Sequence, residues 1–163
     1  DPLTALLTRR AFLQAFDDPR CEEGGRQGAL LLIDVDHFKL YNDTYGHPEG
    51  DACLTRIGEV LSGIAADTMG FAGRYGGEEF TIVLPETDAA SAILRGKEIC
   101  RAMSSLTIRH MDRPLGPVTM SIGIATAPHD SADAVLLLEI ADAALYRAKA
   151  QGRDRVLHAS AQA

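Results

Sequence analysis

Two adjacent glycines, Gly76 and Gly77, constrain the fold of this chain more than any other feature. Short apolar runs flank them on both sides, at residues 70–72 and 80–84, and both runs have the composition of β-strands. A Gly-Gly pair between two such runs predicts a two-residue hairpin. The tight primed turns of such hairpins need positive φ angles, which glycine adopts without steric cost.

Acidic residues stand at the ends of two predicted strands. Residues 29–36 form an almost continuous apolar run that predicts a strand buried on both faces, and its end carries Asp34 and Asp36 on the same side. An ionised carboxylate there is costly unless it is paired or holds a metal, which favours a functional role. Glu78 and Glu79 leave the predicted hairpin turn together and repel each other unless a cation or a proton lies between them. A solvated acidic turn is the structural alternative for this second pair.

Length and composition indicate one ordinary globular domain spanning residues 1–163, with 46% apolar and 24% charged residues. The net charge of −7 argues against a surface for nucleic-acid polymers or anionic membranes, but not against a nucleotide site. No apolar run approaches the roughly 18 residues of a membrane span. The three cysteines, Cys21, Cys53 and Cys100, lack metal-binding spacing, which is typical of reduced cysteines in a cytoplasmic domain.

The remaining pattern alternates helices and strands. Apolar residues at helical spacing predict five helices, and three more strand-like runs complete the set. The first helix is expected to end at Phe16, with Thr8 as its N-cap. Others are expected over 37–44, over about 52–64 and over 132–151. A further helix of about 18 residues is expected after its cap at 85–88. The other strands are expected at 118–125 and 155–157, with 107–109 as a further short candidate. This order predicts an α+β sandwich with a central, mainly antiparallel five-stranded sheet flanked by helices.

Six sequence blocks occur in a fixed order along nearly the whole chain. They are Asp1-x-Leu3-Thr4-x-Leu6-x-x-Arg9-Arg10, Ile33-Asp34-x-Asp36-x-Phe38-Lys39-x-x-Asn42-Asp43, Gly46-His47-x-x-Gly50-Asp51, Arg74-Tyr75-Gly76-Gly77-Glu78-Glu79-Phe80, Ser121-Ile122-Gly123-Ile124-Ala125 and Ala141-Asp142-x-Ala144-Leu145-Tyr146-x-Ala148-Lys149-x-x-Gly152-Arg153. Together they resemble the GGDEF domain of bacterial diguanylate cyclases, in the variant with glutamate at position 78. The resemblance implies a fold similar to class III nucleotidyl cyclases and polymerase palm domains, which agrees with the predicted sandwich.

The resemblance implies an enzyme that joins two GTP molecules into cyclic di-3′,5′-GMP and releases two pyrophosphates. Each protomer of a two-fold homodimer would present one GTP, and each 3′-hydroxyl would attack the α-phosphorus of the other. Two Mg²⁺ (or Mn²⁺) ions per active site are implied, with ligands from Asp34, the carbonyl of Val35, and Glu78. Glu79 matches an acid that binds metal or helps to activate the 3′-hydroxyl.

The family match also assigns residues to the nucleotide. The backbone of His37, Phe38 and Lys39, at the start of a helix, would bind the β- and γ-phosphates. Lys149 and Arg153, four residues apart at the end of the last helix, match phosphate-binding cations. Their structural alternative is a favourable interaction with the helix C-terminus.

Guanine needs a carboxylate acceptor and an amide, which Asp51 and Asn42 would provide. Both residues could otherwise be helix caps. As a guanine ligand, Asp51 should reject ATP strongly. Gly76 and Gly77 would let the backbone approach the triphosphate, and His47 is expected to be a structural or surface residue.

One departure from the family pattern concerns product inhibition. The family's inhibitory site is an Arg-x-x-Asp motif, whose positions correspond here to Asp67 and Gly70. We therefore expect no high-affinity allosteric site for cyclic di-GMP, so that any product inhibition would occur at the active site. Two other functions are conceivable: a GTP-binding regulatory domain without turnover, and a cyclic di-GMP receptor, which would need the missing motif.

The chain opens at Asp1 without an initiator methionine, and we interpret it as a domain from a longer protein. An N-terminal sensory or dimerising region is expected to precede it. That region would hold two copies together, and it could anchor the full-length protein to a membrane.

Overall fold

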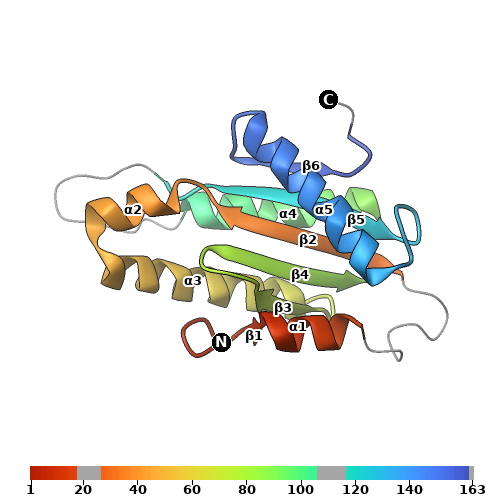
Figure 1. Ribbon diagram of the computed structural model, residues 1–163, viewed down its shortest axis with the longest axis horizontal. Helices are drawn as coiled ribbons and strands as arrows, with labels where there is room; N and C mark the ends of the chain where they lie inside the picture. The colour runs from red at the N-terminus through yellow and green to blue at the C-terminus, as the bar shows by residue number, and fades with distance from the viewer. Residues whose placement is uncertain (18–26, 106–116, 162–163) are drawn as a thin grey trace.

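The computed structural model describes residues 1–17, 27–105 and 117–161, which form one six-stranded sheet with helices on both faces (Figure 1). The strands are β1 (Leu7–Thr8), β2 (Gly28–Val35), β3 (Phe71–Arg74), β4 (Glu79–Pro85), β5 (Met120–Ala127) and β6 (Arg155–His158). Their order across the sheet is β1-β3-β4-β2-β5-β6. The central pairs are antiparallel, whereas β1 and β6 pair parallel at the two edges. The predicted fold class, a mainly antiparallel α+β sandwich, is confirmed.

The predicted number of strands is wrong by one among the described residues, because β1 was not expected. This strand has two residues, Leu7 and Thr8, which pair with Gly73 and Arg74 of β3. Two residues are too few to show a period in the sequence, so only the contact with β3 reveals the strand. The candidate strand at 107–109 lies outside the described residues.

Five helices of the described residues pack on this sheet. They are α1 (Arg9–Phe16), α2 (Phe38–Tyr45), α3 (His47–Ala66), α4 (Ala89–Ser105) and α5 (Ala134–Ala150). Four lie close to the predicted positions, whereas α3 begins at His47, about five residues before the expected start. Thr8 caps α1 as expected, since its Oγ1 accepts a hydrogen bond from Ala11 N at 3.3 Å.

Two apolar cores form because successive residues of β2 point to opposite faces. Leu31 and Ile33 pack with α2, α3 and α4, whereas Leu30 and Leu32 pack with α1 and α5. Asp34 and Asp36 continue the series of Leu30 and Leu32. The two carboxylates therefore emerge on the α5 face, on the same side as predicted.

The two cysteines that the structure describes are free thiols. Burial raises the pKa of both Cys53 and Cys100 to about 11, so neither is a reactive thiolate. Cys21 lies outside the described residues. Among the helices of the described ranges, none is both long and apolar enough to span a membrane.

Candidate active site

Two carboxylates meet where β2 ends and β4 begins. Asp34 lies directly opposite Glu79 in the antiparallel register, and residues so paired project from the same face of a sheet. One residue further on, the N–H of Val35 donates to the carbonyl oxygen of Glu78 at 3.2 Å. The strand end and the hairpin are therefore joined at the residues that the sequence assigned to metal ions.

Lys149 closes this corner from the last turn of α5. Its Nζ lies 2.8 Å from Oδ2 of Asp34, and the two side chains are 32% and 13% exposed. A half-buried carboxylate is tolerated when an opposite charge pairs with it. Lys149, which the family resemblance assigns to the phosphates of a nucleotide, thus contacts the predicted metal ligand.

The donor atoms at this corner suit a hard divalent cation that also binds a nucleotide. Within the described residues, no group of three His, Cys, Asp or Glu side chains is arranged to hold a metal ion. Mg²⁺ is commonly held by one or two carboxylates, with phosphate oxygens and water completing its shell. Asp34 and Glu79 fit that requirement, whereas an all-protein metal cage does not match the geometry.

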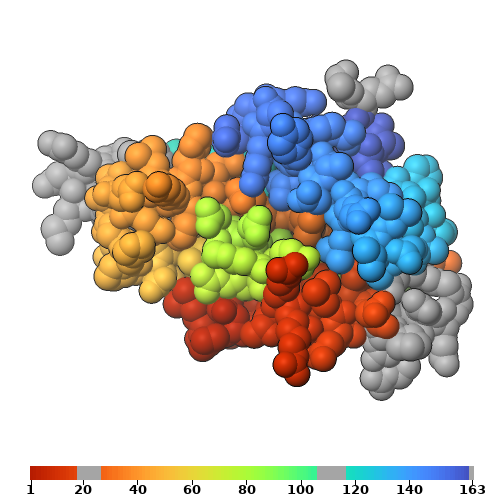
Figure 2. All heavy atoms as spheres, viewed as in Figure 1, coloured from red at the N-terminus to blue at the C-terminus, as the bar shows by residue number. Residues whose placement is uncertain are grey.

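A cleft of about 500 Å³ lies beside the hairpin, between it and the helices α2 and α3. On the face shown in Figure 2, the hairpin atoms lie between those of α2 and α3 on one side and those of α5 on the other. The cleft is lined by Phe38, Lys39, Asn42, Asp43, His47, Asp51, Leu54, Arg74, Gly77 and Glu78. The predicted guanine residues and the hairpin acid Glu78 therefore share one cavity.

Asn42 and Asp51 are not helix caps, so the structural alternative for them is excluded. Asn42 lies within α2 and Asp51 within α3, which Gly46 caps. The Oδ1 atom of Asn42 is buried without a hydrogen-bond partner among the described residues. Gly50 makes room for it, because a Cβ atom there would overlap that oxygen. Asn42 also lines the cleft, where a change of its side-chain rotamer would let this oxygen accept a hydrogen bond from a ligand.

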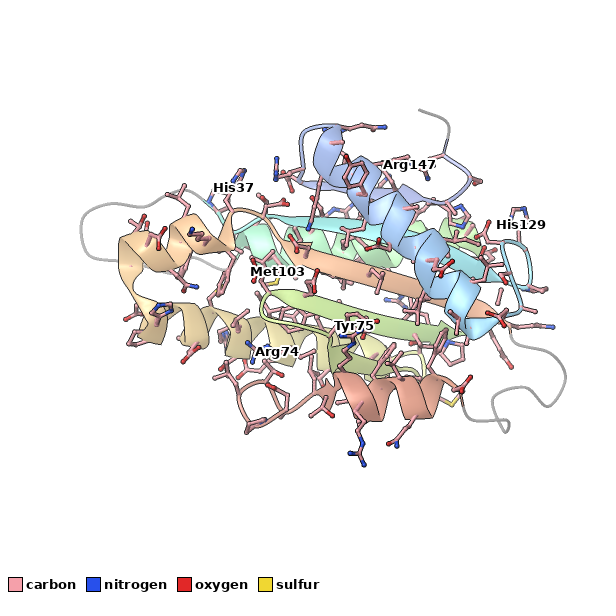
Figure 3. The ribbon with its side chains drawn as sticks, viewed as in Figure 1. His37, Arg74, Tyr75, Met103, His129 and Arg147 are labelled. Carbon is pink, nitrogen blue, oxygen red and sulfur yellow. The ribbon has the colours of Figure 1, made fainter. Side chains whose placement is uncertain are left out.

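The start of α2 has the geometry expected of an anion site. His37, with a left-handed φ of 55°, precedes the helix and makes no side-chain cap (Figure 3). The amides of the first turn, from Phe38 and Lys39 onward, have no acceptor within the helix. They are the groups that the sequence analysis assigned to phosphates.

The hairpin turn differs from the prediction. Four residues connect β3 to β4, and neither Gly76 nor Gly77 has a positive φ. The N–H groups of Tyr75 and Gly76 both donate to the carbonyl oxygen of Glu79, at 2.7 and 3.2 Å, so the loop is wider than a primed turn. A Cβ atom at Gly76 would lie 2.7 Å from Oε2 of Glu79, so a side chain there would displace the end of this exposed glutamate.

Arg74 has a structural role that the sequence analysis missed. Its Nε and Nη2 donate to the carbonyl oxygen of Gly77 at 3.1 and 2.9 Å, and its Nη1 lies 3.3 Å from Oδ1 of Asp1 (Figure 3). Arg74 therefore ties the hairpin loop to the N-terminal turn. A basic residue before two glycines was the only signal in the sequence.

Arg153 does not lie on α5, contrary to expectation. The helix ends at Ala150, and Arg153 follows in a turn with a φ of 62°. Its side chain is exposed, one short turn away from Lys149. His47 is also exposed, as expected, although it lies on the wall of the cleft.

The six-stranded α+β sheet carries carboxylates at a strand end, a lysine from a helix end beside them, and a cleft lined by Asn42 and Asp51, an arrangement suited to a nucleotide with its metal. The family profile "Diguanylate cyclase, GGDEF domain" matches residues 1–155. The chain belongs to the GGDEF domain family.

Individual relatives agree with this assignment. The chain is 38% identical over 130 residues to Diguanylate cyclase A of Treponema denticola. The aligned residues make up 78% of this chain and 34% of that protein. The chain is 36% identical over 160 residues to Diguanylate cyclase VdcA of Vibrio cholerae, with coverages of 96% and 46%. The chain thus spans about a third to a half of these curated relatives.

A solved structure confirms the fold. The GGDEF domain of DgcB from Caulobacter crescentus, determined in complex with c-di-GMP, superposes with a TM-score of 0.88 at 40% identity. The match covers 99% of this chain and 93% of that one.

Proposed function

We propose that residues 1–163 form a single catalytic domain, a diguanylate cyclase that condenses two GTP molecules into cyclic di-3′,5′-GMP. The observation that carries the proposal is the pairing of Asp34 with Glu79 beside the cleft of Asn42 and Asp51. This arrangement would let a nucleotide and its metal ions bind side by side. The similarity to proteins named as diguanylate cyclases supports the same activity.

Guanine would be recognised by the two polar residues of the cleft. The unpaired Oδ1 of Asn42 and the carboxylate of Asp51 are acceptors, and guanine offers two donors on one edge, N1–H and the exocyclic amine. Adenine has no such pair of donors, so these acceptors would stay unpaired in its complex. We therefore expect ATP to be rejected.

The phosphates would lie between the start of α2 and the end of α5. The backbone amides of His37, Phe38 and Lys39 would bind them from one side, and Lys149 and Arg153 would add positive charge from the other. In this arrangement Lys149 would exchange part of its contact with Asp34 for a contact with the nucleotide.

GGDEF diguanylate cyclases are metal-dependent enzymes. We propose that Asp34, the Val35 carbonyl, Glu78 and Glu79 hold two Mg²⁺ or Mn²⁺ ions together with the phosphate oxygens. Such ions polarise an α-phosphate and lower the pKa of a hydroxyl. Glu79, exposed at the hairpin, would bind metal or, with the help of the metal, accept the proton of the attacking 3′-hydroxyl.

The reaction needs two copies of the domain. In each half-reaction a bond forms between a 3′-oxygen and an α-phosphorus, and the bond to the β-phosphate breaks with release of pyrophosphate. One domain holds one GTP, so the second must come from a two-fold partner. We propose a homodimer held by an upstream sensory region, with this domain in the cytoplasm whether or not the full-length protein is membrane-anchored.

Allosteric product inhibition is not part of this proposal. At the two positions of the inhibitory motif, Asp67 ends α3 and Gly70 begins the path into β3. A Cβ atom at Gly70 would overlap the carbonyl oxygen of Val83, so an aspartate would not fit without a backbone shift. Any inhibition by cyclic di-GMP should therefore be competitive and relieved by added GTP.

The test is incubation of the domain at high concentration with GTP and Mg²⁺, followed by chromatography for cyclic di-GMP and pyrophosphate. We expect product that rises with the square of enzyme concentration, is lost in Glu79→Ala, and is retained in Glu59→Ala, a matched exposed glutamate on α3. A forced-dimer fusion controls for weak association. GTP binding without product in that fusion would instead indicate a regulatory GTP-binding domain.

A further inference from the structure

Asp36 is a buried carboxylate whose hydrogen bonds reach two other parts of the fold. It is 8% exposed. Its Oδ1 accepts from Ser121 Oγ at 2.7 Å, and its Oδ2 accepts from Thr119 Oγ1 at 2.9 Å. Oδ2 also accepts from the backbone N–H of Asp154 at 3.0 Å. Burial of a carboxylate is tolerated when donors satisfy it in this way.

The Asp154 contact anchors an unusual turn. Gly152, Arg153 and Asp154 have φ angles of 112°, 62° and 46°, so three successive residues are left-handed and two of them are not glycine. Residues with a Cβ adopt this region rarely, and the surrounding structure must hold them there. The N–H of Arg153 donates to the carbonyl of Ala148 at 3.1 Å on the helix side. Asp36 holds the turn on the sheet side.

Asp36 also borders the start of α2. Its backbone N–H donates to the carbonyl oxygen of Thr119 at 3.0 Å, so the two residues are linked twice. The next residue, His37, is left-handed, and α2 begins at Phe38. One side chain thus connects the two segments that flank the proposed phosphate site.

We propose that Asp36 is a positioning residue for the triphosphate and not a metal ligand. It fixes the turn that carries Arg153 at a set distance from the first amides of α2. The inference rests on the proposed function, because it requires the β- and γ-phosphates to bind between these segments. Both oxygens of Asp36 already accept hydrogen bonds from the protein, whereas Asp34 forms an ion pair with the side chain of Lys149.

Three single substitutions separate the roles. In Asp36→Asn the amide oxygen can still accept from Thr119 and Asp154, while the amide nitrogen can donate to the Ser121 hydroxyl, which is also an acceptor. A positioning role therefore survives the loss of charge, but a metal-ligand role does not. We expect binding of a non-hydrolysable GTP analogue with Mg²⁺ to weaken less than about threefold in Asp36→Asn, and about tenfold or more in Asp36→Ala and Asp34→Asn.

The phosphate dependence gives a readout that a general loss of structure would not produce. Asp36→Ala should weaken the GTP analogue but leave the affinity for GMP, which lacks the β- and γ-phosphates, within about twofold. Arg153→Ala should do the same, and the double variant should be no weaker than either single one, because Asp36 acts through Arg153. Thermal unfolding monitors the fold of each variant.

The inference and the proposed function fail in different ways. If the substitutions change nucleotide binding as expected but the wild-type domain makes no cyclic di-GMP, the proposed activity is contradicted and the proposed role of Asp36 is not. Loss of analogue binding in Asp36→Asn as severe as in Asp34→Asn would identify Asp36 as a metal ligand and overturn the inference. Additive effects of Asp36→Ala and Arg153→Ala would also overturn it. If Asp36→Ala does not fold, Asp36→Asn decides the question.

Discussion

The Nζ atom of Lys149 lies 2.8 Å from Oδ2 of Asp34, so a protein cation occupies the position beside the principal proposed metal ligand. The lysine comes from the end of α5 and the aspartate from the end of β2. A divalent cation that binds Asp34 has to compete with this ammonium group. In the proposed function, metal affinity and phosphate binding would therefore be linked through Lys149.

Replacement of Lys149 should therefore separate metal binding from turnover. In Lys149→Met we expect Mn²⁺ to bind the nucleotide-free domain about fivefold more tightly, the factor for loss of an ion pair worth about 1 kcal/mol. Cyclic di-GMP formation should fall about tenfold or more, because a cation is lost from the phosphates. Mn²⁺ binding is measured by electron paramagnetic resonance, and Lys97→Met, on the exposed face of α4, is the matched control. Unchanged or weaker Mn²⁺ binding would refute the competition.

Selectivity for guanine should depend on the exocyclic amine, from which Asp51 is proposed to accept a hydrogen bond. Wild-type protein should bind GTP more tightly than inosine triphosphate, which lacks this amine. In Asp51→Ala, GTP affinity should fall about tenfold to a hundredfold and the preference over inosine triphosphate should disappear. Titration calorimetry measures both nucleotides, and Asp67→Ala, at the far end of the same helix, is the control. A preference that persists in Asp51→Ala would assign the amine to another residue.

Two glycines of α3 should respond oppositely to alanine. A Cβ atom at Gly50 would overlap Oδ1 of Asn42, whereas one at Gly63 meets nothing within 4 Å. Gly63→Ala should stabilise the domain by about 0.4–1 kcal/mol, since it lowers the entropy of the unfolded chain. Gly50→Ala should lower stability by about 1–3 kcal/mol and weaken GTP binding, because Asn42 must move. Urea unfolding of both variants measures the difference, and equal effects would contradict the close contact.

Stability should depend on pH through His158. This side chain is 3% exposed, and its Nε2 lies 3.1 Å from Oδ2 of Asp130. The N–H of Ser160 donates to its Nδ1, which leaves that nitrogen as an acceptor in the neutral ring. Burial lowers the pKa of His158 below its ordinary value of 6.5, although the Asp130 carboxylate opposes this shift. The neutral ring is therefore the form that the folded protein prefers.

The sign of the effect follows from that preference. The contribution of His158 is fully present above pH 6.5 and is lost as the pH falls through the lowered pKa, because the unfolded chain takes up the proton more readily. The urea midpoint should fall between about pH 7.5 and pH 5.5, and the fall should be smaller in His158→Gln. The control variant is His129→Gln, because His129 contacts the same Asp130 but is exposed. An equal pH slope in wild type and His158→Gln would exclude this group.

Much of the fold could be predicted because it is encoded locally. The buried run of β2, the apolar stripes of the helices and the Thr8 cap each depend on residues a few positions apart, and the structure confirms them. The site residues were named for a different reason, their resemblance to family motifs. Sequence order alone could not place Asp34 opposite Glu79, although both residues were singled out.

Tertiary structure decided the pairings. β1 exists only through its contact with β3, the hairpin loop is shaped by Arg74, and Arg153 leaves the helix in a left-handed turn. Asp36 accepts hydrogen bonds from Ser121 and Asp154, which lie 85 and 118 positions further along the chain. Periodicity is set by neighbours in sequence, and it fixes which face a side chain joins. The partner of a buried charge is set by which distant segments pack against that face, and only the folded chain determines that.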